Sequence, residues 1–124
     1  MRVVNLTVFV MEREDGAAAL RQRPDTGLLA GLWEYPHAEG TLDEAAAAAQ
    51  LAAWGVTALQ WRRTLHAKHA FTHLRWQMTG YLLTVAGAGQ PDWLWAGAAA
   101  RRQRAIPSAF QAFTAALEDG AAGE

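Results

Sequence analysis

The second half of this 124-residue sequence concentrates basic side chains that could bind a polyanion. Residues 61–104 hold seven lysines and arginines against one acidic residue, Asp92, whereas residues 1–60 hold four basic and eight acidic residues. Such side chains suit phosphate groups if they share one face, and are ordinary solvated charges if they are scattered. The seven are Arg62, Arg63, Lys68, Arg75, Arg101, Arg102 and Arg104.

Three of the four histidines, His66, His69 and His73, lie in the same region. A β-strand points successive side chains to opposite faces, so it cannot present all three to one metal ion, and no carboxylate stands nearby in the sequence. We therefore predict no metal site here. The chain has no cysteine, which excludes disulfides, thiol catalysis and cysteine-bound zinc or iron–sulfur clusters.

Alternating apolar and polar residues predict the strands that would position these side chains. Leu74, Trp76 and Met78 alternate with polar neighbours, which gives that segment one apolar and one polar face. The expected strands cover residues 4–10, 17–23, 32–35, 56–64 and a long segment through 69–85.

Two helices are expected beside these strands. The alanine-rich segment "TLDEAAAAAQLAAWGV" predicts a helix capped by Thr41 or Asp43 and ended by Gly55. Pro107 suits the first turn of a last helix, "PSAFQAFTAALEDG", with its apolar residues on one face. Several strands with one inserted and one terminal helix predict a single α+β or α/β domain.

Three segments, in this order, resemble one family. "RPDTGLLAGLWEYP" (23–36) resembles the Gly-Leu-Leu-Ala-Gly-Leu-Trp-Glu-Phe-Pro signature of the C-terminal domain of MutY-type adenine DNA glycosylases. "HAFTH" (69–73) resembles that domain's Phe-Ser-His loop, and "AIPSAF" (105–110) its closing Leu-Pro helix. The resemblance covers nearly the whole chain and implies an α+β, Nudix-like fold related to the MutT hydrolases, with a mixed β-sheet sandwiched between helices. We expect one domain over residues 1–119 and a short tail at 120–124.

The same resemblance implies that the alanine helix has lost a metal site. In active Nudix hydrolases this helix carries Arg-Glu-Leu-x-Glu-Glu, whose glutamates bind magnesium. The six aligned positions, 48–53, read Ala-Ala-Gln-Leu-Ala-Ala and contain no carboxylate. We therefore expect a scaffold role for the helix and no catalytic residue in this chain.

By resemblance, the domain recognises 8-oxoguanine opposite adenine in duplex DNA. Oxidation turns guanine N7 into an N–H donor, and the hydroxyl of Thr72, where the family usually has serine, can accept that hydrogen bond. Phe71 would pack beside the base or orient the loop, and His73 would donate to phosphate or brace the loop. Without the resemblance, we would expect Phe71 to be a core residue, Thr72 a strand residue and His73 a solvated residue.

Three further residues flank this loop. We expect Lys68, His69 and Arg75 to contact phosphates, which position a protein on DNA without specifying sequence.

The expected partners are duplex DNA with 8-oxoguanine and a glycosylase catalytic domain, in cis or in trans. The iron–sulfur cluster of such enzymes belongs to that catalytic domain, so we expect no cofactor here. The apolar start of the chain is too short and too alternating to span a membrane, and we expect a cytoplasmic monomer. Two alternatives remain: a nucleotide pyrophosphohydrolase with a rearranged metal site, and a protein-interaction module that uses the leucine-rich segment.

Overall fold

A mixed β-sheet forms the centre of the computed structural model, which describes residues 1–122. Strand β1 runs parallel to β6, and the other pairs of neighbouring strands are antiparallel. The sheet order is β3-β2-β1-β6-β5, with β4 paired to β1 and β7 paired to β2. The strands are β1 (Arg2–Glu12), β2 (Ala18–Gln22), β3 (Trp33–Glu34), β4 (His37–Glu39), β5 (Val56–Ala70), β6 (Leu74–Gly87) and β7 (Trp93–Ala96).

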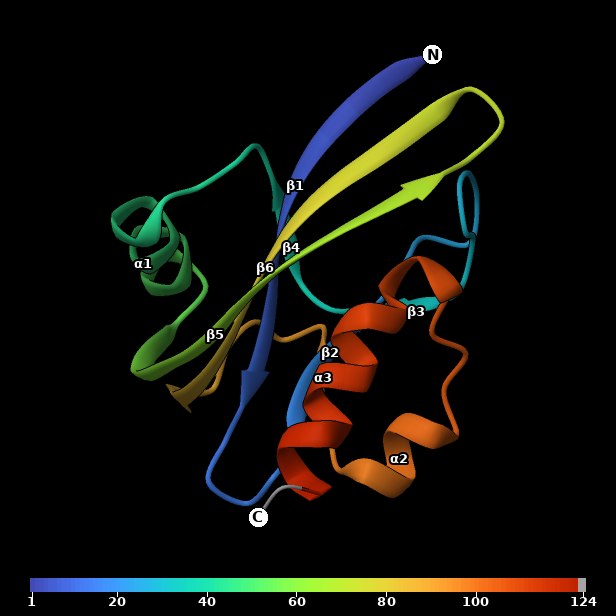
Figure 1. The fold of residues 1–124 in the computed structure, drawn as a ribbon. Coiled ribbons are helices and arrows are strands. Elements are labelled where there is room, and N and C mark those ends of the chain that lie inside the picture. Colours follow the sequence, from blue (N-terminus) through green and yellow to red (C-terminus); the bar gives the residue numbers. More distant parts are fainter. Residues whose placement is uncertain (123–124) are drawn as a thin grey trace.

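Helices cover both faces of this sheet (Figure 1). Helix α1 (Glu44–Ala53) lies on one face, and η1 (Ser108–Phe110) with α3 (Gln111–Ala122) lies on the other. The short helix α2 (Ala98–Arg102) follows β7. The expected α+β sandwich is confirmed. Of the tail expected at 120–124, positions 120–122 continue α3, and 123–124 lie outside the described residues.

Alternation along the central strands creates two hydrophobic cores. Val8 of β1 and Trp76 of β6 point toward α3, where they meet Phe110 and other buried residues. Phe9 and Leu83 point the opposite way and pack against Leu51 of α1 and its neighbours.

The alanine helix begins as expected, because the Asp43 carboxylate caps it. Its Oδ1 accepts a hydrogen bond from the Ala46 N–H at 2.8 Å. Only Ala47 and Leu51 of this helix are buried, so the remaining alanines face solvent. Gly55 then adopts a φ of 81°, which lets the chain turn into β5.

The segment around residue 72 corrects one expectation. A strand was expected to run through residues 69–85, but β5 ends at Ala70 and β6 starts at Leu74, so a turn interrupts it. Together β5 and β6 form a long hairpin, and β5 is an edge strand. Within the described residues, no helix has the length and apolar character needed to cross a membrane.

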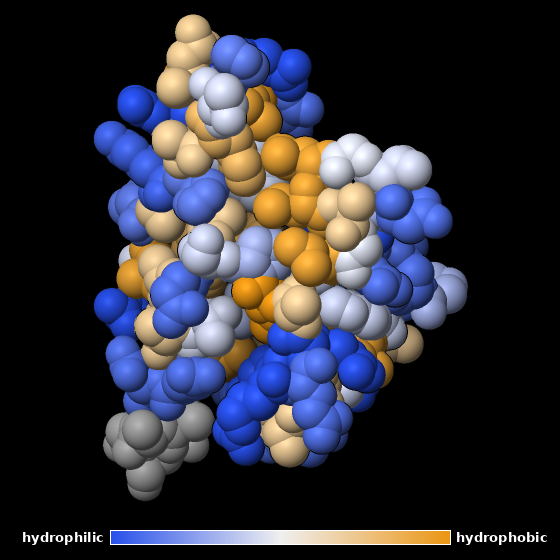
Figure 2. All heavy atoms as spheres, turned by 90° about the vertical axis from the view of Figure 1, so that its right-hand side faces the viewer, coloured by the Kyte–Doolittle hydropathy of each residue, from blue (hydrophilic) through white to orange (hydrophobic). Residues whose placement is uncertain are grey.

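The side of the molecule that carries the hairpin tip and α2 has a mixed surface. Figure 2 shows an apolar band across this side and a strongly hydrophilic region beneath it. Among the partly buried apolar residues packed on the α3-side core are Leu29, Phe71 and Ile106, and Leu28 is 38% exposed.

Candidate functional site

The tip of the β5–β6 hairpin consists of two residues, Thr72 and His73. The Phe71 N–H donates to the Leu74 carbonyl oxygen at 2.7 Å and closes the turn. The Arg2 N–H donates to the His73 carbonyl at 3.2 Å, so the start of β1 also holds the tip. Both tip side chains are exposed. The turn therefore presents one hydroxyl and one imidazole to solvent from a fixed backbone.

Aromatic packing braces one face of the hairpin. Phe71 is half-buried and stands edge-on to two rings, His69 at 4.8 Å and Trp76 at 5.0 Å between centroids. Trp76 in turn lies 5.8 Å from Phe110, at the start of the C-terminal helical segment. A continuous row of rings thus connects the tip to the core, and edge-on pairs of this kind are stabilising.

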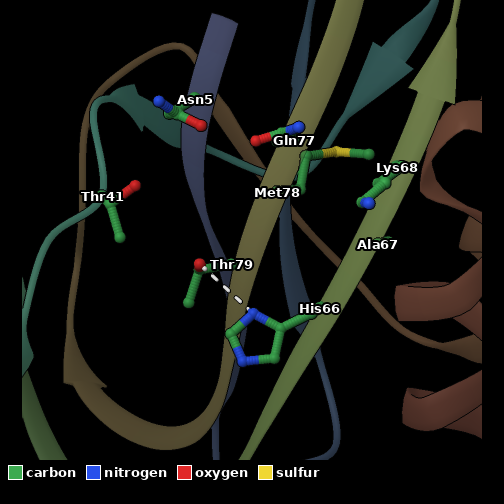
Figure 3. A pocket seen from close by; sticks show the side chains of 8 residues that line it. All are labelled: Asn5, Thr41, His66, Ala67, Lys68, Gln77, Met78 and Thr79. Atoms are coloured by element: carbon green, nitrogen blue, oxygen red, sulfur yellow. Dashed lines mark hydrogen bonds between the residues drawn. The ribbon is translucent and has the colours of Figure 1, made fainter.

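The opposite face of the hairpin is polar and hollowed. His66 and Lys68 of β5 line a pocket of about 530 Å³ together with Gln77 and Thr79 of β6. Figure 3 shows these side chains from close by. The register pairs His66 with Thr79, whose hydroxyl lies 3.5 Å from His66 Nδ1, and Lys68 with Gln77. Asn5 and Thr41 are also among the side chains that Figure 3 labels in this pocket.

The structure divides the six residues expected to bind DNA among three places. Thr72 and His73 lie at the tip, and His69 and Phe71 lie in the aromatic row. Lys68 pairs with Gln77, and Arg75 pairs with Ala70. Paired residues share a face of the sheet, so Lys68 and Arg75 both belong to the polar face. Lys68 and Arg75 therefore flank the tip on a different side from His69, and one flat surface cannot contact all three.

The remaining basic residues lie away from the tip of the hairpin. Arg62 donates to Glu12 Oε1 at 3.0 Å, which occupies it in a surface ion pair. The arginines of the Arg101–Arg104 segment lie on and just after α2. The basic region of the sequence thus separates into clusters on different elements.

A charged cluster behind the aromatic row was not predicted from the sequence. Buried Glu34 accepts from Arg21 Nε at 2.8 Å and from Arg23 Nη1 at 2.6 Å. His37 Nδ1 lies 3.8 Å from the same carboxylate and 3.1 Å from the Tyr35 carbonyl. The signal in the sequence is weak: Arg21 and Arg23 stand two residues apart, as on one face of a strand, and Glu34 lies between Trp33 and Tyr35 in the next segment expected to be a strand.

Burial sets the protonation of two groups in this region. It lowers the pKa of His37 below its usual 6.5, although neighbouring Glu34 acts in the opposite direction. Burial also raises the pKa of Tyr35, whose hydroxyl lies 2.7 Å from that of Thr114. At neutral pH both groups are therefore uncharged.

The residues around α1 do not fit a magnesium site. Magnesium needs several oxygen ligands, usually including carboxylates. Glu44 is the only carboxylate in α1, and both oxygens of Glu34 are bonded to arginines. Among the described residues, no group of three histidines or carboxylates could hold a metal ion.

Comparisons with known proteins agree with this fold. The sequence profile of the NUDIX domain matches residues 7–116, and the chain belongs to this family. The C-terminal domain of mouse MUTYH, solved in complex with human PCNA, is 27% identical with a TM-score of 0.64, over 94% of this chain and 88% of that chain.

Nudix hydrolases show the same fold at lower identity. MutT, from a study of the Aliivibrio salmonicida and Vibrio cholerae proteins, is 17% identical with a TM-score of 0.65, over 94% of this chain and 97% of that chain. RenU, a Nudix hydrolase from M. smegmatis, is 22% identical with a TM-score of 0.62, over 98% of this chain and 87% of that chain. Similarity to both MutT proteins and a MutY-type C-terminal domain leaves the activity to be argued from the residues.

Proposed function

We propose that this domain is a non-catalytic recognition module of a MutY-type adenine DNA glycosylase, which binds 8-oxoguanine opposite adenine in duplex DNA. The observation that carries the proposal is the exposed Thr72 hydroxyl on a closed two-residue turn, which Phe71 anchors through Trp76 to the core. A fixed acceptor can select the N7–H of 8-oxoguanine, because unmodified guanine has no hydrogen there to donate.

The surroundings of the tip suit a DNA backbone. Lys68 and Arg75 are exposed on the polar face beside the tip, where they can contact phosphates on one side of the base. His73 adds a donor at the tip itself. The absence of carboxylates from positions 48–53 of the alanine helix supports a binding role over a hydrolytic one.

A fluorescence titration at low salt tests this proposal. Two duplexes should be used, identical except for 8-oxoguanine or guanine opposite adenine. We expect weak, salt-sensitive binding with a preference for the lesion. Equal affinity for both duplexes, or magnesium-dependent release of phosphate from a nucleotide, would contradict it.

A protein-binding role for the leucine-rich loop is a second candidate. Leu28 is 38% exposed, and Leu29 adopts an unusual φ of 54°. The loop is ordered by Arg23 Nε, which donates to the Leu28 carbonyl at 3.0 Å, and by the Gly31 N–H, which donates to the Pro24 carbonyl at 2.8 Å. An ordered exposed leucine suits a protein interface, for which a glycosylase catalytic domain is the expected partner.

A pull-down with a MutY-type catalytic domain tests this second role. Leu28→Asp should abolish binding, and Leu59→Asp, at another exposed leucine, should not. Equal binding by wild type and both variants would remove the loop from the interface.

A further inference from the structure

A small cleft between α2 and α3 brings together three arginines. Arg101, Arg102 and Arg104 line one side of a hollow of about 170 Å³, and Gln111 and Thr114 belong to the other. The acidic residue in its lining is Glu118, so three positive charges stand against one negative charge. Helix α2, which carries Arg101 and Arg102, lies on the side of the molecule that Figure 2 turns toward the viewer.

Contacts within the protein fix two of these arginines. Arg101 is 7% exposed, and its Nη1 donates to the Ala96 carbonyl at 2.8 Å. The Arg104 guanidinium lies 5.2 Å from the ring centroid of Trp33, and the backbone beside it is fixed because Trp33 N–H donates to the Ala105 carbonyl. These two charges are therefore held in place before any ligand arrives.

One hydrogen-bond donor in this cluster has no acceptor. Arg104 Nε is buried and forms no hydrogen bond within the described part of the chain. Among residues 1–119, no carboxylate lies within ion-pair distance of Arg102 or Arg104. A buried donor without a partner is costly, so the Arg104 side chain would be stabilised by turning its Nε–H toward an oxygen atom bound in the hollow.

We propose that this cleft binds a phosphate group, from either a nucleotide or a nucleic-acid backbone. The Nε–H and an Nη–H of arginine form a fork that matches two oxygens of an anion. Donors on both α2 and α3 surround the hollow, which suits a tetrahedral oxyanion better than a flat carboxylate. Buried Tyr35 stays protonated and can donate to Thr114, which frees the Thr114 hydroxyl hydrogen for the ligand.

The proposal does not depend on lesion recognition by the hairpin, because it can be tested with free phosphate. The ¹⁵N-labelled chain should be titrated with inorganic phosphate and with dGMP at constant ionic strength. We expect saturable shifts of the Trp33 indole and of the amides of residues 101–104. Arg104→Gln and Arg102→Gln should each weaken binding by about tenfold or more, since each removes a charge-assisted hydrogen bond.

Arg13→Gln is a matched control, because the Arg13 guanidinium also lies against a tryptophan, 4.1 Å from the Trp95 ring centroid. It should leave phosphate binding unchanged. Glu118→Gln should tighten binding by removing the opposing charge. Circular dichroism and thermal melting check that each variant folds, and exposed Arg102 keeps the test valid if Arg104→Gln does not fold.

Duplex binding distinguishes the two sources of phosphate. If the cleft contacts a DNA backbone, Arg104→Gln should reduce the dependence of log affinity on log salt by about one, equally for guanine and 8-oxoguanine duplexes. An unchanged salt dependence with retained dGMP binding would assign the site to free nucleotides. Absence of saturable shifts with both phosphate and dGMP, together with unchanged salt dependence, would overturn the proposal.

Discussion

The ring of Phe71 stands edge-on to the indole of Trp76, with 5.0 Å between the centroids. This contact joins the exposed tip of the hairpin to the core under α3, because Trp76 is 5% exposed and packs beside Phe110. The position of Thr72 in space therefore depends on a residue that need not touch DNA itself.

Replacing Phe71 with alanine should loosen the tip and destabilise the fold. The variant loses a half-buried ring and two edge-on pairs, which predicts a decrease of about 1–3 kcal/mol in the free energy of unfolding. Urea unfolding measures the loss, and hydrogen exchange should show faster exchange of the Phe71 amide. Leu59→Ala, at a 54% exposed position of β5, should cost less than about 0.5 kcal/mol.

Replacing Thr72 with alanine should remove part of the preference for 8-oxoguanine. Losing one base contact should decrease the difference in binding free energy between the lesion duplex and the guanine duplex by about 1–2 kcal/mol. The free energy of unfolding should hardly change, because Thr72 is exposed and the turn is closed by backbone atoms. Paired fluorescence titrations of the two duplexes give the difference directly.

Thr72→Ser provides the control for this measurement. Serine keeps the hydroxyl and removes only the methyl group, so the preference should be retained. A full preference in Thr72→Ala, or its loss in Thr72→Ser, would show that the hydroxyl is not the discriminating group.

Local sequence patterns predicted β1, β2, β3, β6 and the helices α1 and α3, but they predicted no strand at β4 or β7. Asp43 caps α1, and Trp76 and Met78 face the core, as their spacing indicated. The turn at Thr72 was not predicted as a break in a strand because neither tip residue is a glycine or proline, the usual signals of a tight turn. The resemblance to a known loop, and not periodicity, drew attention to it.

The arrangement of the candidate site depended on long-range pairing that no local pattern contains. Lys68 and His69 are adjacent in sequence but face opposite sides, and only the register with Gln77 and Trp76 shows which neighbours each one has. The pairing of Glu34 with Arg21 and Arg23 likewise needs β2 and β3 to lie side by side. Such contacts follow from topology and cannot be read from composition.

Replacing Glu34 with glutamine should strongly destabilise the domain. Its carboxylate is 5% exposed and neutralises two arginines, so removing its charge leaves both guanidinium groups without their partner. Breaking one side of a buried ion pair predicts a loss of about 3 kcal/mol or more in the free energy of unfolding. Urea denaturation at neutral pH measures this loss.

Glu12→Gln is the matched comparison, since it breaks the Glu12–Arg62 pair, whose side chains are 20% and 27% exposed. An exposed pair of this kind should contribute less than about 1 kcal/mol. Equal losses for the two variants would show that burial of Glu34 does not determine its contribution.

His37 should make the stability of the domain depend on pH. Burial lowers its pKa in the folded state, and the unfolded chain has the usual value of 6.5. The unfolded state therefore binds a proton more readily in the window below 6.5. The stability that comes from keeping His37 uncharged in the folded state is fully present above pH 6.5. It is lost as the pH falls below 6.5, so the free energy of unfolding decreases.

Replacing His37 with glutamine should reduce this dependence, because glutamine does not titrate. Urea unfolding of both proteins between about pH 7.5 and pH 5 gives the two slopes, and the difference isolates His37 from the other titrating groups. Glutamine also loses the stacking of the imidazole on Phe110, 6.1 Å between centroids, so the variant should be less stable at every pH. If the free energy of unfolding of the variant changes with pH as steeply as that of the wild type, His37 is protonated equally well in the folded and unfolded chains. That result would contradict the effect expected from its buried position between Glu34 and Phe110.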